Sequence, residues 1–149
     1  VLGGGSSSRL FLEVRQRRSL CYGIGAHWSG SDRDGFIQVV TGTTPERVQE
    51  TLETTLSTIR EAAKGLSEDE IARAVLQFRS QLVRGGESTQ ARASALARDA
   101  ALFGRVRSLP ERIAEIESVE PADVNAIAAA WADLEPTIVA VGPEASQPW

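Results

Sequence analysis

Few side chains in this sequence could hold a metal ion or act as a nucleophile. The chain has one cysteine, Cys21, and one histidine, His27. A zinc site built from His and Cys needs three or four such ligands, and a lone cysteine forms no disulfide within the chain. Counting therefore excludes a self-contained His/Cys zinc enzyme. We predict no metal site here and interpret Cys21 and His27 as ordinary strand residues.

A run of glycine and serine at residues 3–8 precedes an amphipathic segment that is typical of a helix. Backbone amides at a helix N-terminus attract anions, so the run could cradle a phosphate. A P-loop, however, needs a lysine directly after its second glycine, and the only lysine of this chain is Lys64. The run is better interpreted as a lead-in to the helix, with serine hydroxyls as candidate N-caps. An anion-binding module stays as an alternative function.

Several charged residues gather at the end of this first helix, and a tyrosine follows them. The charged residues are Glu13, Arg15, Arg17 and Arg18, and the tyrosine is Tyr22. Cations are favourable at the negative end of a helix dipole, so the arginines alone indicate a solvated helix end. Taken by itself, Tyr22 is typical of a half-buried aromatic residue with its hydroxyl at the rim.

Composition limits the classes of function. The chain has 149 residues, of which 42% are hydrophobic and 24% charged, the balance of one globular domain. Its net charge is -4, which offers no basic face for nucleic acid. No apolar run approaches the roughly 20 residues that cross a bilayer. We therefore expect no nucleic-acid partner and no membrane segment.

Hydrophobic periodicity predicts a hairpin followed by helices. Apolar residues alternate over 20–28 and again over 36–41, on either side of a turn at 29–35. A helix start at Thr44 and Pro45 leads into an apolar stripe made of Val48, Leu52, Leu56 and Ile59. Further helices begin near Ser67, Ser88, Ser108 and Pro121. Residues 137–141 are apolar on both faces, which indicates an interior strand.

These elements predict an α+β fold with an antiparallel or mixed β-sheet and helices packed on one face. We expect a single domain over residues 1–142 and a tail at 143–149. The predicted strands are few for so many helices, and the chain opens on Val1 rather than Met. We therefore expect further strands and a helix upstream of Val1, and a chain that is truncated at its N-terminus.

The first 22 residues closely resemble a block in one family of enzymes. The stretch Leu-Gly-Gly-Gly-Ser-Ser-Ser-Arg-Leu-Phe, with the Glu-Val-Arg and Leu-Cys-Tyr that follow it, is similar to the start of the C-terminal half of pitrilysin, insulinase and mitochondrial-processing-peptidase zinc metallopeptidases. Residues 67–74, 116–124 and 138–142 are similar to later parts of that half. The departures are Ser6 for a usual Met, Ser19 for a usual Gly, and Glu120 for a common Thr cap.

The resemblance implies a fold, a partner and a mechanism. The fold is a half-clamshell domain of the mitochondrial-processing-peptidase-like type. In this family the N-terminal half carries the zinc on an inverted His-x-x-Glu-His motif. The C-terminal half binds no metal and contributes an arginine and a tyrosine seven positions apart. Arg15 and Tyr22 match that spacing.

By resemblance, Tyr22 is a catalytic residue that stabilises the oxyanion, and Arg15 binds substrate together with Tyr22. The implied partners are peptide substrates and a zinc-bearing N-terminal half, either fused or separate; a dimer stays open. Alone, the chain should be inactive and hold no cofactor. The alternative is a silent relative that serves as a structural or assembly subunit. We expect a cytoplasmic location.

Overall fold

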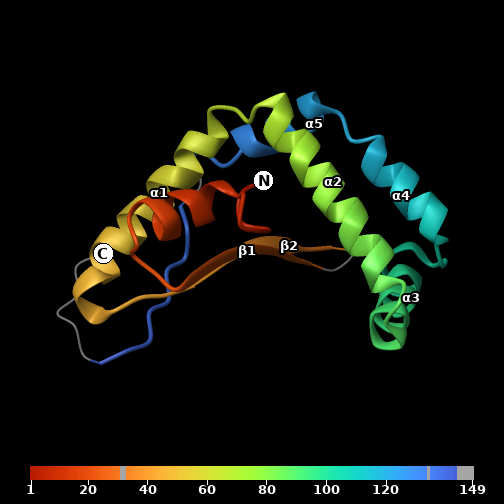
Figure 1. The fold of residues 1–149 in the computed structure, drawn as a ribbon, viewed down its shortest axis with the longest axis horizontal. Coiled ribbons are helices and arrows are strands. Elements are labelled where there is room, and N and C mark those ends of the chain that lie inside the picture. The colour runs from red at the N-terminus through yellow and green to blue at the C-terminus, as the bar shows by residue number, and fades with distance from the viewer. Residues whose placement is uncertain (31–32, 134, 144–149) are drawn as a thin grey trace. The chain divides into compact units, whose positions relative to one another are not determined.

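A computed structural model of the chain describes residues 1–30, 33–133 and 135–143 (Figure 1). The chain divides into two compact units, which are described separately. Unit 1 comprises Val1–His27, Ile37–Leu66 and Asn125–Trp149. Unit 2 comprises Trp28–Phe36 and Ser67–Val124.

The predicted hairpin is confirmed. Strands β1 (Gly23–Gly30) and β2 (Gly35–Gly42) form a two-stranded antiparallel sheet. β1 begins three residues later than Leu20, where the alternating pattern predicts it. The reason is that the backbone before Gly23 bonds to a neighbouring helix and to side chains rather than to a strand, as shown below. The pattern also overestimates the turn, because pairing continues to Gly30 and resumes at Gly35.

A π-helix, η1 (Phe11–Arg17), follows the glycine-serine run in unit 1. Arg9 and Leu10 form a helical turn directly before it, and Ser8 precedes that turn. The Ser8 hydroxyl is buried without a hydrogen-bond partner among the described residues, so it does not act as the predicted cap. Leu10 and Val14 are fully buried. The run itself packs beside β1, since the amide of Ala26 donates to the carbonyl of Gly3 (3.2 Å). A Cβ at Gly3 would come within 2.4 Å of the Ala26 backbone nitrogen, so close packing explains this glycine.

The single turn η2 (Pro45–Arg47) leads into α1 (Val48–Ala63), and both belong to unit 1. The four members of the predicted apolar stripe lie on α1 and are half-buried. The buried face consists instead of Thr51, Thr54, Thr55, Thr58, Ala62 and Ala63. Three of these threonines place their hydroxyls within 2.7 Å of carbonyls four residues earlier. Their polar atoms are thereby satisfied and their methyl groups can pack. Within unit 1, Figure 1 shows η1 lying between α1 and the hairpin.

Unit 2 is helical, with α2 (Glu68–Gly85), α3 (Thr89–Phe103) and α4 (Leu109–Glu117). The predicted starts are confirmed: Ser67 and Ser108 each form a capping box with the glutamate three residues later, and Ser88 accepts from the amide of Ala91. α3 ends at Gly104, whose φ of 64° lies in the left-handed region that favours glycine. A fifth helix, α5 (Pro121–Ala129), follows α4.

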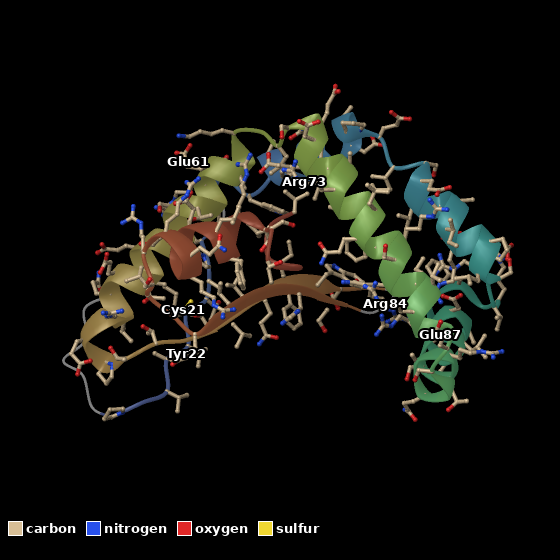
Figure 2. All side chains as sticks on the ribbon, in the orientation of Figure 1. Cys21, Tyr22, Glu61, Arg73, Arg84 and Glu87 are labelled. Atoms are coloured by element: carbon tan, nitrogen blue, oxygen red, sulfur yellow. The ribbon has the colours of Figure 1, made fainter. Side chains whose placement is uncertain are left out.

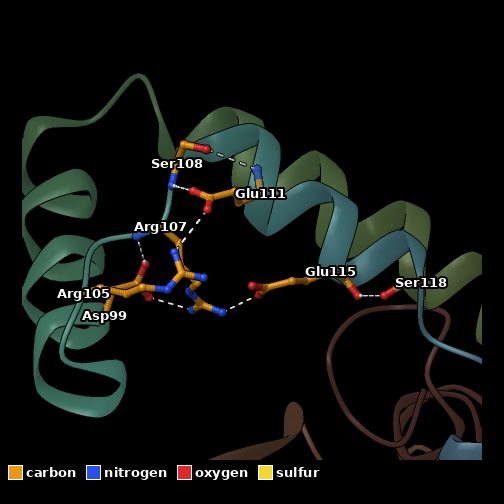
Figure 3. Close-up of polar contacts among 7 residues, drawn as sticks. All are labelled: Asp99, Arg105, Arg107, Ser108, Glu111, Glu115 and Ser118. Atoms are coloured by element: carbon orange, nitrogen blue, oxygen red, sulfur yellow. Dashed lines mark hydrogen bonds and ion pairs between the residues drawn. The ribbon is translucent and has the colours of Figure 1, made fainter.

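A buried ion cluster joins α3 to the start of α4 within unit 2 (Figure 3). Asp99 is only 2% exposed, and it accepts from the Arg107 guanidinium (2.6 Å) and from the Arg107 backbone amide (3.1 Å). Arg107 also pairs with Glu115 and lies over the Phe103 ring, 4.0 Å from its centroid. The hydrogen bond from Arg107 lowers the pKa of Asp99 to about 2, against the opposing effect of burial.

The α+β class is confirmed, but the last predicted strand is not. Residues 137–141 form no strand, and Val139 and Val141 are 83% and 98% exposed. An apolar segment becomes an interior strand only when it pairs on both sides, and the sheet in the described part of the chain has only β1 and β2. Of the predicted tail, residues 144–149 lie outside the described residues. The single domain over 1–142 stays a prediction.

Among the helices that the structure describes, we find none that combines the length and the apolar character needed to cross a bilayer.

Candidate functional site

Tyr22 lies on the short segment that connects η1 to β1. Its side chain is 95% exposed, so the expectation of a half-buried ring is wrong. Figure 2 shows Tyr22 at the start of the hairpin, with Cys21 beside it. Within the ranges 1–30, 33–133 and 135–143, no hydrogen bond to the Tyr22 hydroxyl is found. A phenol with this exposure can donate to a group on another molecule.

The backbone of this segment is tied to the helix that carries Arg15. The amide of Ser19 donates to the carbonyl of Arg15 (3.1 Å), and the amide of Leu20 donates to the carbonyl of Val14 (2.9 Å). The side chains of Leu20 and Val14 are buried. The backbones of the two predicted site residues are therefore coupled through short hydrogen-bonded links.

Three side chains from the β2–α1 region hold the same segment from the other side. The guanidinium of Arg47 donates to the Ser19 carbonyl (2.7 Å). The Thr43 hydroxyl donates to the Leu20 carbonyl (2.6 Å), and the Thr41 hydroxyl donates to the Gly23 carbonyl (3.1 Å). We call Thr41, Thr43 and Arg47 the brace. It fixes the backbone on both sides of Tyr22 and leaves the ring exposed.

Ser19 adopts a left-handed conformation, with φ of 54°. It is the one residue other than glycine with a positive φ in the described part of the chain. A side chain at such a φ costs about 1–2 kcal/mol. Ser19 therefore stands at a position where the backbone favours glycine, and the family that the sequence resembles usually has Gly there. The Arg47 bond to the Ser19 carbonyl helps to hold this conformation.

The arginines near η1 have different surroundings. Arg15 is exposed, and its guanidinium lies over the Phe11 ring, 4.6 Å from the centroid. Arg17 forms an ion pair with Glu13 one turn earlier. A guanidinium that stacks on a ring keeps the N–H groups in its own plane available, so Arg15 can still form a bidentate contact.

Sequence reasoning missed the brace and the role of Arg9. The Arg9 guanidinium donates to the carbonyls of Glu61 (3.2 Å) and Gly65 (2.9 Å), which lie at and just after the end of α1. Carbonyls at a helix C-terminus lack intrahelical partners, so a cation is favourable there. Two threonines and an arginine at the end of a strand and just after it carry no pattern that points to carbonyls 18 to 28 residues away. No signal in the sequence alone could have found the brace.

Cys21 and His27 are not brought together with other ligands. Cys21 is half-buried and His27 is exposed on β1. In the portion of the chain that the structure describes, no group of three or more His, Cys, Asp or Glu side chains could hold a metal ion. These described residues do not fit a zinc site.

Comparison with known proteins places this geometry in a family. The family model described as the peptidase M16 inactive domain matches residues 1–78, which include η1, the hairpin and the brace. This match covers more than half of the chain. The chain belongs to the peptidase M16 inactive-domain family. The resemblance of the first 22 residues is thereby confirmed.

Relatives of this M16 domain include named zinc proteases. This chain is 36% identical to an uncharacterised zinc protease of Streptomyces coelicolor, over 96% of this chain and 31% of that protein. The solved peptidase M16 inactive domain of Pseudomonas fluorescens shares the fold, with a TM-score of 0.69 and 22% identity over 87% of this chain and 31% of that one. A chain of complex III2 from Candida albicans matches with a TM-score of 0.70 and 21% identity, over 83% and 30%.

This M16 domain therefore spans about a third of the length of these relatives. The comparisons confirm the zinc metallopeptidase family and the α+β class. The roles of Arg15 and Tyr22 stay predictions.

Proposed function

We propose that this M16 domain is the substrate-binding accessory half of a zinc-dependent endopeptidase and is inactive alone. In this proposal it contributes Arg15 and Tyr22 to an active site on a zinc-bearing partner half, fused or separate, and the substrates are peptides. The observation that supports it most is the exposed Tyr22 ring on a backbone that is held on both sides.

Tyr22 would act as a hydrogen-bond donor to the carbonyl oxygen of the scissile peptide bond. Negative charge grows on that oxygen as the carbonyl becomes tetrahedral, so the phenol stabilises the transition state more than the bound substrate. The side chain suits this role because its hydroxyl has no partner within the described residues that the substrate would have to displace.

Arg15 would position the peptide. Its guanidinium is planar, always charged, and able to make two parallel hydrogen bonds to a carboxylate or to carbonyl oxygens. The Phe11 ring beneath it limits the orientations of that plane. A substrate group held by Arg15 would be placed relative to Tyr22, because the amides of Ser19 and Leu20, just before Tyr22, bond to the carbonyls of Arg15 and Val14.

The zinc of such an enzyme would belong to the other half. This assignment is supported by the family, whose model is named an inactive domain, and by the lack of a ligand cluster among the described residues. Zinc there supplies Lewis-acid polarisation of the carbonyl and activation of water.

The test uses the assembled enzyme, meaning this chain together with its zinc-bearing half. Tyr22→Phe removes only the hydroxyl and should lower kcat by about 10- to 1,000-fold with unchanged zinc content. Trp28→Phe is the matched control, since Trp28 is another exposed aromatic residue of the hairpin, at 62%; kcat should stay within about twofold of the parent. Unchanged turnover in Tyr22→Phe would remove Tyr22 from the mechanism.

The alternative is a catalytically silent subunit with a role in assembly. The fold permits that use, since a chain of complex III2 has the same fold. A scaffold would need no exposed phenol held in this way. Under the alternative, neither Tyr22→Phe nor Arg15→Ala would affect peptide hydrolysis in the assembled protein.

A further inference from the structure

We propose that the brace positions Tyr22 for catalysis, with Thr43 as its central member. This inference rests on the proposed function, because it concerns how the same phenol is held. It assigns a role to residues from the β2–α1 region, which lie about 20 to 25 positions after Tyr22 in the chain.

The brace bonds fall on both sides of the residue they would position. Arg47 and Thr43 hold the carbonyls of Ser19 and Leu20, before Tyr22, and Thr41 holds the carbonyl of Gly23, after it. The Tyr22 side chain itself is 95% exposed. The backbone that the brace holds sets the direction of the Tyr22 Cα–Cβ bond, and therefore the region that the phenol can reach.

The brace is anchored in the buried face of α1. The Thr51 hydroxyl lies within hydrogen-bond distance of the Thr43 hydroxyl (3.1 Å) and of the Arg47 carbonyl (2.7 Å). Thr51 is itself 2% exposed. One buried side chain therefore contacts both of the brace members that hold the carbonyls before Tyr22.

Such a brace should affect turnover more than substrate binding. A donor to a developing oxyanion must be held within roughly 0.5 Å, and a displacement of about 1 Å can cost about 100-fold in rate. In the proposed function Arg15 also holds the peptide, and Arg15 lies on η1 rather than on the braced segment. Loss of the Thr43 bond should therefore lower kcat and leave KM nearly unchanged.

The experiment is a double-mutant cycle in the assembled enzyme. Thr43→Val removes the hydroxyl at constant shape, and Thr51 keeps the Arg47 carbonyl as acceptor. We expect kcat to fall about 10- to 100-fold, with KM within about twofold and zinc content unchanged. Thr58→Val is the matched control, because that buried hydroxyl bonds only to the Thr54 carbonyl of its own helix. Its kcat should equal that of the parent.

The second arm of the cycle separates the two proposals. In the Tyr22→Phe background, Thr43→Val should change kcat by less than about twofold, because the phenol it positions is already gone. An equal loss in both backgrounds would overturn the inference and indicate a structural role. If Tyr22→Phe lowers kcat but Thr43→Val does not, the brace inference fails and the proposed function stands. If Tyr22→Phe has no effect, the proposed function fails.

Thr41→Val keeps the proposal testable if Thr43→Val does not fold. Thr41 is exposed and holds the Gly23 carbonyl on the other side of Tyr22. Its loss should lower kcat about threefold or more, again only when Tyr22 is present. Unchanged kcat in Thr41→Val, in a protein where Tyr22→Phe is impaired, would contradict the brace.

Discussion

Two polar regions of this chain are held by similar bonds but leave different groups available. In the Tyr22 segment, side chains donate to backbone carbonyls, and the tyrosine that these bonds surround stays exposed. In the Asp99 cluster of unit 2, the charged side chains bond to one another and to the backbone, and Asp99 is buried. The first region holds a backbone segment and leaves the Tyr22 hydroxyl exposed. In the second region, the charged groups of Asp99 and Arg107 are used to hold α3 and α4 together.

The comparison shows that a shifted pKa alone does not mark a functional residue in this chain. Asp99 has the strongly lowered pKa that often marks a functional site. Here the cause is a structural ion pair with Arg107, and the Asp99 carboxylate is buried away from solvent. The Tyr22 ring is exposed on a backbone that is held on both sides, which suits catalysis better. Burial and hydrogen-bond partners distinguish the two regions.

The largest expected effect is on stability, from Asp99→Asn. The variant removes the buried charge that pairs with the half-buried Arg107 guanidinium and leaves the more exposed Glu115 as its ion-pair partner. Breaking one side of a buried pair costs about 3–5 kcal/mol, and because Glu115 remains we expect about 3 kcal/mol. Urea unfolding measures it. Tyr22→Phe is the contrasting variant and should change the free energy of unfolding by less than about 0.5 kcal/mol. Similar losses in both variants would erase the difference between the two regions.

The pH dependence of stability should sharpen the same comparison. The pKa of Asp99 is about 2 in the folded chain and about 4 when unfolded. A lowered pKa means that the unfolded state binds the proton more tightly. The contribution of ionised Asp99 to the free energy of unfolding is therefore complete above about pH 5. It falls by about 2 kcal/mol as the pH drops toward 2. Urea unfolding of the parent and of Asp99→Asn, between pH 6 and 2, should show that excess loss only in the parent. Parallel profiles would contradict the assignment.

The smallest effect is expected at Ser19. Glycine tolerates a φ of 54° without the cost that serine bears, but it loses more chain entropy on folding. Ser19→Gly should therefore stabilise the chain by about 0.5–1 kcal/mol, as measured by the shift in the urea midpoint. A destabilised variant would mean that the left-handed conformation is not the one adopted before Tyr22.

The sequence predicted the local elements well and the long-range contacts poorly. The caps at Ser67, Ser88 and Ser108 depend on residues a few positions apart, and each was found where expected. The hairpin was also found, with shifted strand ends. The buried face of α1 was missed because threonine counts as polar, although hydroxyls that bond back to their own helix leave methyl groups to pack. The strand predicted at 137–141 is not found, because an apolar pattern does not show whether partner strands are present.

The candidate site shows the same limit. Arg15 and Tyr22 came from a family resemblance, and nothing in their own pattern distinguished them from a solvated helix end and a half-buried ring. The exposure of Tyr22 and the bonds from Thr41, Thr43 and Arg47 depend on where β2 and α1 lie in space. No local period encodes such contacts.

The most direct test of the account is whether Tyr22 binds the transition state more strongly than the substrate. In the assembled enzyme, the affinity for a phosphinic peptide, a mimic of the tetrahedral carbon, should fall in Tyr22→Phe by the same factor as kcat/KM, about 10- to 1,000-fold. Binding of a product peptide should change by less than about twofold. Equal affinity of both enzymes for the phosphinic peptide would contradict the central claim.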